Sequence, residues 1–103
     1  MTPELKARFD DEVKSHKIVL YMKGNQLFPQ CGFSARALEV LKPYGPIFSV
    51  DVLADPAVRE GIKEYSNWPT IPQVYINGQF VGGCDIVTEL AARGELEAMV
   101  KGG

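Results

Sequence analysis

An Asn-Gly pair at residues 77–78 separates two short apolar stretches, residues 73–76 and 79–81. Asparagine and glycine tolerate the positive backbone φ angles of the two-residue turn that joins neighbouring antiparallel strands. The sequence therefore predicts a β-hairpin late in the chain. Gly82 and Gly83 follow the second stretch and are expected to end the second strand.

Two further stretches carry a strand pattern. Residues 18–22 form an apolar run with β-branched members, which is typical of a buried strand. Residues 47–52 form another such stretch, after an intervening helical pattern. A strand, a helix and a second strand in this order predict a right-handed parallel crossover.

Helical patterns, with apolar residues three or four positions apart, begin near Pro3, Gly32 and Pro56, and a last one runs from Ile86 to Lys101. The element order is therefore helix, strand, helix, strand, helix, strand, strand, helix. This order predicts an α/β chain with a four-stranded mixed sheet that is flanked by helices on both faces. That arrangement is the thioredoxin fold with an additional N-terminal helix.

Local signals predict where the helices begin and end. Thr2 and Asp55 each precede a proline, which is the pattern of a capping side chain followed by proline at the first helical position. Asn67 predicts the end of the third helix. Asp85 is expected to cap the last helical region, which Gly94 interrupts.

Size and charge restrict the function classes. The 103 residues fit a single domain, residues 1–103, and the formal net charge of -2 gives no sign of a nucleic acid or anionic lipid partner. No apolar run approaches the roughly 20 residues that cross a bilayer, so no membrane association is expected. Residues 1–11 lack the apolar segment of a secretory signal and are too acidic for a transit peptide. We therefore expect a cytoplasmic protein, or an organellar one if a transit peptide has been removed.

Cys31 and Cys84 lie far apart in the sequence and do not form the dense disulfide framework of a small secreted domain. A reducing, intracellular setting is expected. There, a cysteine is more often catalytic, metal-binding or simply buried than part of a structural disulfide.

Cys31 precedes the second helical pattern, and the start of a helix presents unpaired N–H groups and the positive end of the helix dipole. Both stabilise a thiolate, and Lys23 adds a positive charge if its loop folds back. The plainer interpretation, a small buried core cysteine, stays open. Ser34 stands where a dithiol protein has its second cysteine, so the chain cannot run a local Cys-x-x-Cys cycle. A single thiolate can still hold a mixed disulfide with a small thiol or ligate a metal.

The motifs around Cys31 resemble those of the monothiol glutaredoxins of the Cys-Gly-Phe-Ser class. The resemblance covers almost the whole chain and rests on four segments in order: Lys23-Gly24, Pro29-Gln30-Cys31-Gly32-Phe33-Ser34, Trp68-Pro69-Thr70-Ile71-Pro72-Gln73 and Gly82-Gly83-Cys84-Asp85. It implies glutathione as cofactor and Cys31 as the catalytic or metal-ligating thiol.

The resemblance also implies how glutathione is held. Pro72 would follow a cis peptide bond, which lets the Ile71 backbone pair with the extended tripeptide as an added strand. Lys23 and Arg59 would meet the glycine carboxylate of glutathione. From the residues alone, Arg59 is more often a solvated surface charge than a ligand contact, and a plain surface lysine remains an alternative for Lys23.

At the other end, Cys84 and Asp85 would meet the γ-glutamyl group, with backbone N–H groups donating to its carboxylate. Asp85 alone is also explained as a helix cap, and Cys84 as a packing residue. Phe33 and Trp68 are expected to pack rather than to contact a ligand.

Two functions are open. The first is the carriage of a 2Fe-2S cluster, which takes four ligands. Cys31 and glutathione thiolates would bridge the cluster between two chains of a homodimer. Without the cluster the chain would be monomeric. Apo iron–sulfur proteins, and a BolA-type protein, are the partners that the resemblance implies. The second is a glutathione-dependent thiol–disulfide oxidoreductase acting through Cys31, a reaction in which this class is weak.

Overall fold

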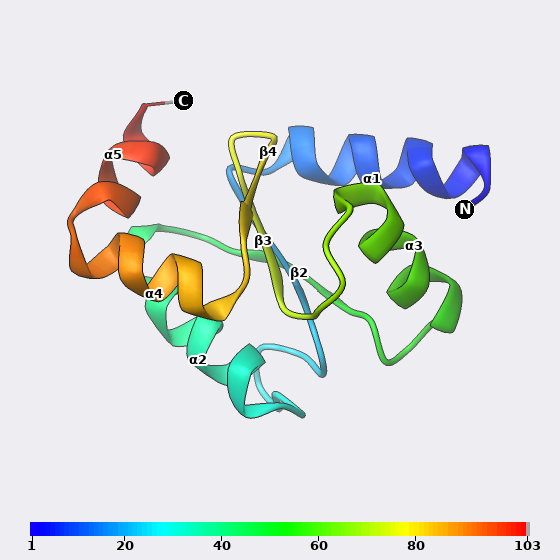
Figure 1. Cartoon of the computed structure of the whole chain (residues 1–103), viewed down its shortest axis with the longest axis horizontal. Helices are drawn as coiled ribbons and strands as arrows, with labels where there is room; N and C mark the ends of the chain where they lie inside the picture. The colour runs from blue at the N-terminus through cyan, green and yellow to red at the C-terminus, as the bar shows by residue number, and fades with distance from the viewer. Residues whose placement is uncertain (103) are drawn as a thin grey trace.

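The computed structural model describes residues 1–102. The four strands of this part of the chain form one mixed sheet (Figure 1). The strand order is β2-β1-β3-β4. The central strand β1 (Ile18–Met22) pairs parallel with β2 (Phe48–Asp51) and antiparallel with β3 (Gln73–Ile76). β4 (Gln79–Gly82) completes the predicted hairpin. The predicted thioredoxin fold is confirmed.

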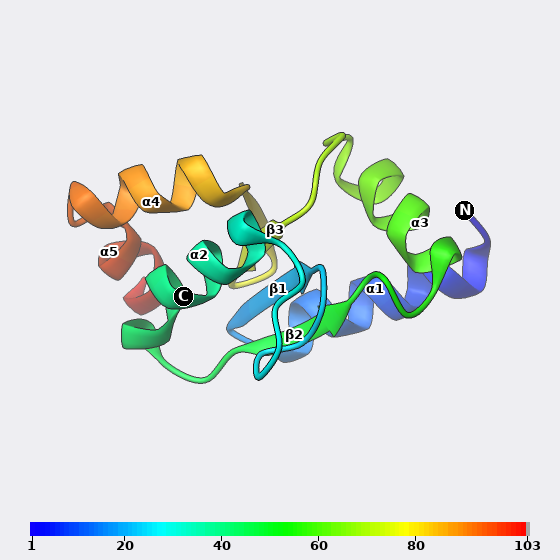
Figure 2. The ribbon, with the colours of Figure 1, turned by 90° about the horizontal axis from the view of Figure 1, so that it is seen from below.

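Helices cover both faces of this sheet (Figures 1 and 2). One face carries α1 (Pro3–Ser15) and α3 (Pro56–Ser66), and the other carries α2 (Gly32–Leu41), α4 (Cys84–Ala92) and α5 (Glu95–Lys101). A short 3₁₀ turn, Lys42–Tyr44, follows α2.

The two apolar cores meet at β1, whose five residues are all buried. Its side chains alternate between the sheet faces, as the two-residue period of a strand requires. Ile18 belongs to the core under α2, α4 and α5, whereas Val19 and Tyr21 belong to the core under α1 and α3. Because helices cover both faces, this strand is a continuous apolar run rather than an alternating one.

Most of the predicted helix starts and ends are confirmed. Thr2 Oγ1 accepts a hydrogen bond from the Leu5 N–H at 3.1 Å, and Asp55 caps α3 through the Ala57 N–H at 2.9 Å. Asn67 ends α3 in the left-handed conformation with φ 55°.

The predicted start of the last helical region, at Ile86 with Asp85 as its cap, is wrong, whereas its interruption at Gly94 is confirmed. The N-cap of α4 is Gly83, so Cys84 and Asp85 lie inside its first turn and Asp85 does not cap the helix. An acid in the first turn still favours the helix electrostatically, because the N–H groups there are unpaired. Gly94, with φ 78°, divides the region into α4 and α5, since this backbone conformation ends a helix and favours glycine. Among the helices of residues 1–102, none is long and apolar enough to cross a membrane.

Candidate functional site

Cys31 is the N-cap residue of α2 and is partly exposed. Partial burial opposes ionisation of its thiol, but the backbone N–H groups of Ser34 and Phe33, the Ser34 hydroxyl and the Lys23 ammonium all favour the thiolate. Together they place the pKa of Cys31 below its ordinary value. The expected activation of this thiol by the helix start and by Lys23 is thus present. The plainer alternative of a buried core cysteine is wrong for Cys31.

The loop after β1 folds back because several polar contacts hold it. The fully buried Ser34 hydroxyl accepts the Lys23 N–H at 3.0 Å, which ties the end of β1 to the first turn of α2. Asp51 Oδ1 accepts the Gly24 N–H at 2.9 Å. Gly24 has φ +89°, and a Cβ there would lie 2.5 Å from the Phe28 carbonyl oxygen, so only glycine fits.

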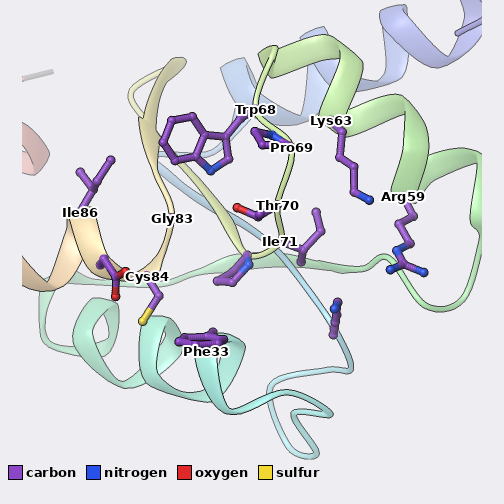
Figure 3. Close-up of a pocket in the computed structure, with 13 residues that line it drawn as sticks. Phe33, Arg59, Lys63, Trp68, Pro69, Thr70, Ile71, Gly83, Cys84 and Ile86 are labelled. Carbon is purple, nitrogen blue, oxygen red and sulfur yellow. The ribbon is translucent and has the colours of Figure 1, made fainter.

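A cleft of about 450 Å³ opens beside this loop (Figure 3). The residues that line it are Lys23, Phe33, Arg59, Lys63, Trp68, Pro69, Thr70, Ile71, Pro72, Gly83, Cys84, Asp85 and Ile86. Every residue predicted to bind glutathione besides Cys31 is among them. Cys31 itself is not, but Lys23 and Phe33, which act on its thiol, do line the cleft.

The cleft has cationic residues on one side and the start of a helix on the other. Figure 3 shows Arg59 and Lys63 projecting from α3, with Cys84 and Ile86 across the cleft at the start of α4. Lys63 was not predicted. It lies four residues after Arg59, a spacing that puts both side chains on the same face of α3 and that could have revealed it. Its ammonium lies 3.4 Å from Glu60 Oε2.

Between these two sides lies the segment before β3, and the predicted cis peptide bond Ile71-Pro72 is present. Within residues 1–102, no hydrogen bond engages the backbone N–H or C=O of Ile71. The Arg59 Nε and Trp68 Nε1 atoms are buried without a hydrogen-bond partner. Because buried donors and peptide groups are normally satisfied, these features suit a peptide-like ligand with carboxylate groups.

The two aromatic side chains that were expected to pack behave differently. Phe33 is 62% exposed, so it does not pack in the core as expected. It lies in the first turn of α2 and lines the cleft instead. Trp68 does pack, with its ring centroid 5.6 Å from that of Phe80, but it also lines the cleft. Cys84 is buried in the core as expected, and neither cysteine forms a disulfide.

Comparison with known proteins identifies the family. The glutaredoxin family model matches residues 18–81. The chain belongs to the glutaredoxin family. It is 56% identical to the uncharacterized monothiol glutaredoxin ycf64-like of Synechocystis, over 98% of this chain and 95% of that protein. It is also 51% identical to the chloroplastic monothiol glutaredoxin-S7 of rice, over 94% of this chain but only 58% of the rice protein.

The structures agree with this assignment. The solution structure of reduced poplar apo GrxS14 superposes with a TM-score of 0.87 at 51% identity, covering 98% of this chain and 94% of that one. This glutaredoxin is of the monothiol class, since Ser34 follows Cys31 at the position of a second thiol. Glutaredoxins use glutathione, and the cations and unpaired Ile71 backbone of the cleft suit that tripeptide.

Proposed function

We propose that this monothiol glutaredoxin binds and transfers a 2Fe-2S cluster, held between two copies of the chain by Cys31 and glutathione thiolates. One observation carries the proposal: Cys31 is a single, partly exposed thiol with a lowered pKa beside a cleft suited to glutathione. A thiolate is the form of cysteine that binds metal.

The number of available ligands favours a dimer. Among the described residues, no group of three or more histidine, cysteine or acidic side chains could hold a metal ion. Cys84 is buried in the core, which leaves Cys31 as the accessible thiol of each chain. A 2Fe-2S cluster takes four ligands, so two chains and two further thiolates from glutathione complete the set.

The residues of the cleft would orient the tripeptide. Lys23 and Arg59 would bind its glycine carboxylate, and the Ile71 backbone would pair with its peptide groups. Asp85 would accept from the γ-glutamyl ammonium, while the N–H groups at the start of α4 would donate to the neighbouring carboxylate. Bound glutathione would supply a second thiolate next to Cys31.

This arrangement implies a monomer without the cluster and a homodimer with it. The thiolates of glutathione are exchangeable ligands, which suits transfer to apo iron–sulfur proteins, and a BolA-type protein is a candidate partner. We propose a cytoplasmic location, with an organelle as the alternative. The rice relative is chloroplastic by name, and cell fractionation of the native protein would distinguish the two.

Anaerobic reconstitution with iron, sulfide and glutathione tests the proposal. The expected product shows the visible absorption of a 2Fe-2S cluster and the native mass of a dimer with two glutathiones. Cys31→Ser should yield a colourless monomer, and so should omission of glutathione. His16→Asn is the control, because His16 is exposed and stacks on Phe48 away from the cleft. A colourless wild type, or a cluster that survives Cys31→Ser, contradicts the proposal.

The lowered pKa of Cys31 also favours a second function, glutathione-dependent thiol–disulfide exchange. The Cys31 thiolate would attack the glutathione sulfur of a glutathionylated protein and release that protein's thiolate. It would then pass the glutathionyl group to a second glutathione, which leaves as the disulfide. Steady turnover of a glutathionylated substrate that Cys31→Ser abolishes would support this function, and no turnover would exclude it.

A further inference from the structure

Gln73 is a buried polar residue whose role the motifs around Cys31 do not explain. In the described part of the chain, Ser34 and Gln73 are the two buried polar residues, both 0% exposed. Ser34 supports the loop around Cys31 from the first turn of α2. Gln73 is the first residue of β3, directly after Pro72, and its backbone pairs with Tyr21 of the central strand.

All the polar atoms of the Gln73 side chain are engaged. Nε2 donates to the Trp68 carbonyl at 3.1 Å and to the Thr70 carbonyl at 3.3 Å, and Oε1 accepts from the Tyr75 hydroxyl at 3.4 Å. Burial raises the pKa of Tyr75, so its hydroxyl stays protonated as a donor. The amide orientation is defined by these partners, since a carbonyl oxygen can only accept.

These contacts connect the cleft wall to the sheet. Residues 68–72 all line the cleft, and they lie outside any helix or strand. The amide of Gln73 binds two carbonyls within this segment and leaves the backbone of Ile71 unpaired. The sheet thereby holds the segment through a side chain that does not itself line the cleft.

We propose that Gln73 is a positioning residue for glutathione, which orders the 68–72 segment so that the Ile71 backbone is presented to the tripeptide. A segment that is already ordered loses less conformational entropy on binding. The inference deepens the proposed function, because it rests on the glutathione site that cluster binding also needs. It is tested on the cluster-free protein, so a failure of cluster binding and a failure of this inference give different results.

The assay compares two mixed disulfides on Cys31. In each, the Cys31 thiolate attacks a symmetric disulfide, forms the mixed disulfide and releases one thiolate. One reagent is glutathione disulfide, which carries the tripeptide, and the other is the disulfide of 2-mercaptoethanol, which does not. Intact mass gives both equilibrium constants, and their ratio isolates recognition of the tripeptide from the chemistry of the thiol.

Gln73→Met keeps a side chain of similar length and removes the three hydrogen bonds. The glutathione constant should fall at least about tenfold, or about 1.4 kcal/mol, while the mercaptoethanol constant should change less than about twofold because the contacts of Cys31 are intact. Val74→Ala is the matched control, since it weakens the neighbouring buried position of β3 without touching the segment. It should leave the ratio unchanged.

Two results would overturn the inference: an unchanged glutathione constant in Gln73→Met, or equal losses for both reagents. If Gln73→Met does not fold, Gln73→Asn keeps the amide on a shorter side chain that moves the amide nitrogen away from the Trp68 carbonyl. A folded Gln73→Asn protein should again lose affinity selectively for glutathione. Wild-type values for both reagents in that variant would equally refute the role of Gln73.

Discussion

Replacing Ser34 by alanine tests how the fold activates Cys31. The Ser34 hydroxyl is fully buried and accepts the Lys23 N–H at 3.0 Å, and it also favours the Cys31 thiolate. Ser34→Ala leaves the Lys23 N–H without its acceptor and removes one donor from the thiolate. The pKa of Cys31 should therefore rise toward the ordinary value, although the backbone N–H groups of Ser34 and Phe33 remain.

The size of the effect on stability follows from the lost bond. An unsatisfied buried donor costs about 1–3 kcal/mol, and each kcal/mol lowers the melting temperature of a domain of this size by about 4–8 °C. Ultraviolet thiolate absorbance against pH measures the pKa of Cys31, and guanidinium unfolding measures the stability.

Ser66→Ala is the matched control. Ser66 donates to the Ile62 carbonyl at 3.0 Å and accepts the Trp68 N–H at 3.1 Å, so its loss should also lower stability. It should leave the pKa of Cys31 unchanged. The reasoning is refuted if Ser34→Ala keeps the wild-type pKa of Cys31, or if Ser66→Ala raises it as much.

Three further predictions follow from the same site. Arg59→Gln should weaken glutathione mixed-disulfide formation more than Lys63→Gln, because Lys63 already pairs with Glu60. Equal losses of the mixed-disulfide equilibrium constant in the two variants at low salt would contradict this. Gly24→Ala should lower the melting temperature and raise the pKa of Cys31, because a Cβ at residue 24 would lie 2.5 Å from the Phe28 carbonyl oxygen. Calorimetry measures the melting temperature and thiolate absorbance measures the pKa. A wild-type melting temperature would be inconsistent with the loop geometry. Because the folded pKa of Cys31 is lowered, the ionised thiol should stabilise the protein fully above the unfolded value of about 8.5 and progressively less as pH falls through the folded value. The difference in unfolding free energy between wild type and Cys31→Ser measures this, and a difference independent of pH would rule it out.

Interactions between residues close in sequence made much of this fold predictable. The Thr2 cap bonds an N–H three residues away, and the Asp55 cap bonds one two residues away. The Asn77-Gly78 turn has both residues at positive φ, as its sequence predicts. Interactions of such short range are visible in the sequence, because neighbours in the chain are neighbours in space. The absence of a local Cys-x-x-Cys cycle can likewise be read from the sequence, because it follows from Ser34 alone.

The last helical region marks the limit of local signals. Asp85 is a good capping residue by type, yet α4 already begins at Cys84. The hairpin returns the chain to the sheet edge at Gly82 and Gly83, and the position of that edge decides where the helix starts. The capping preference of one side chain contributes only about 1 kcal/mol, so tertiary constraints override it.

The cleft itself was decided by tertiary structure. Lys23, Arg59 and Asp85 come from the ends or faces of three different elements, and only the packing of α3 and α4 around β3 brings them together. The sequence by itself determined the reactive thiol, the missing second thiol and the order of helices and strands. The tertiary structure alone revealed the amide of Gln73 beneath the wall of the cleft, because burial and distances between remote segments depend on the whole fold.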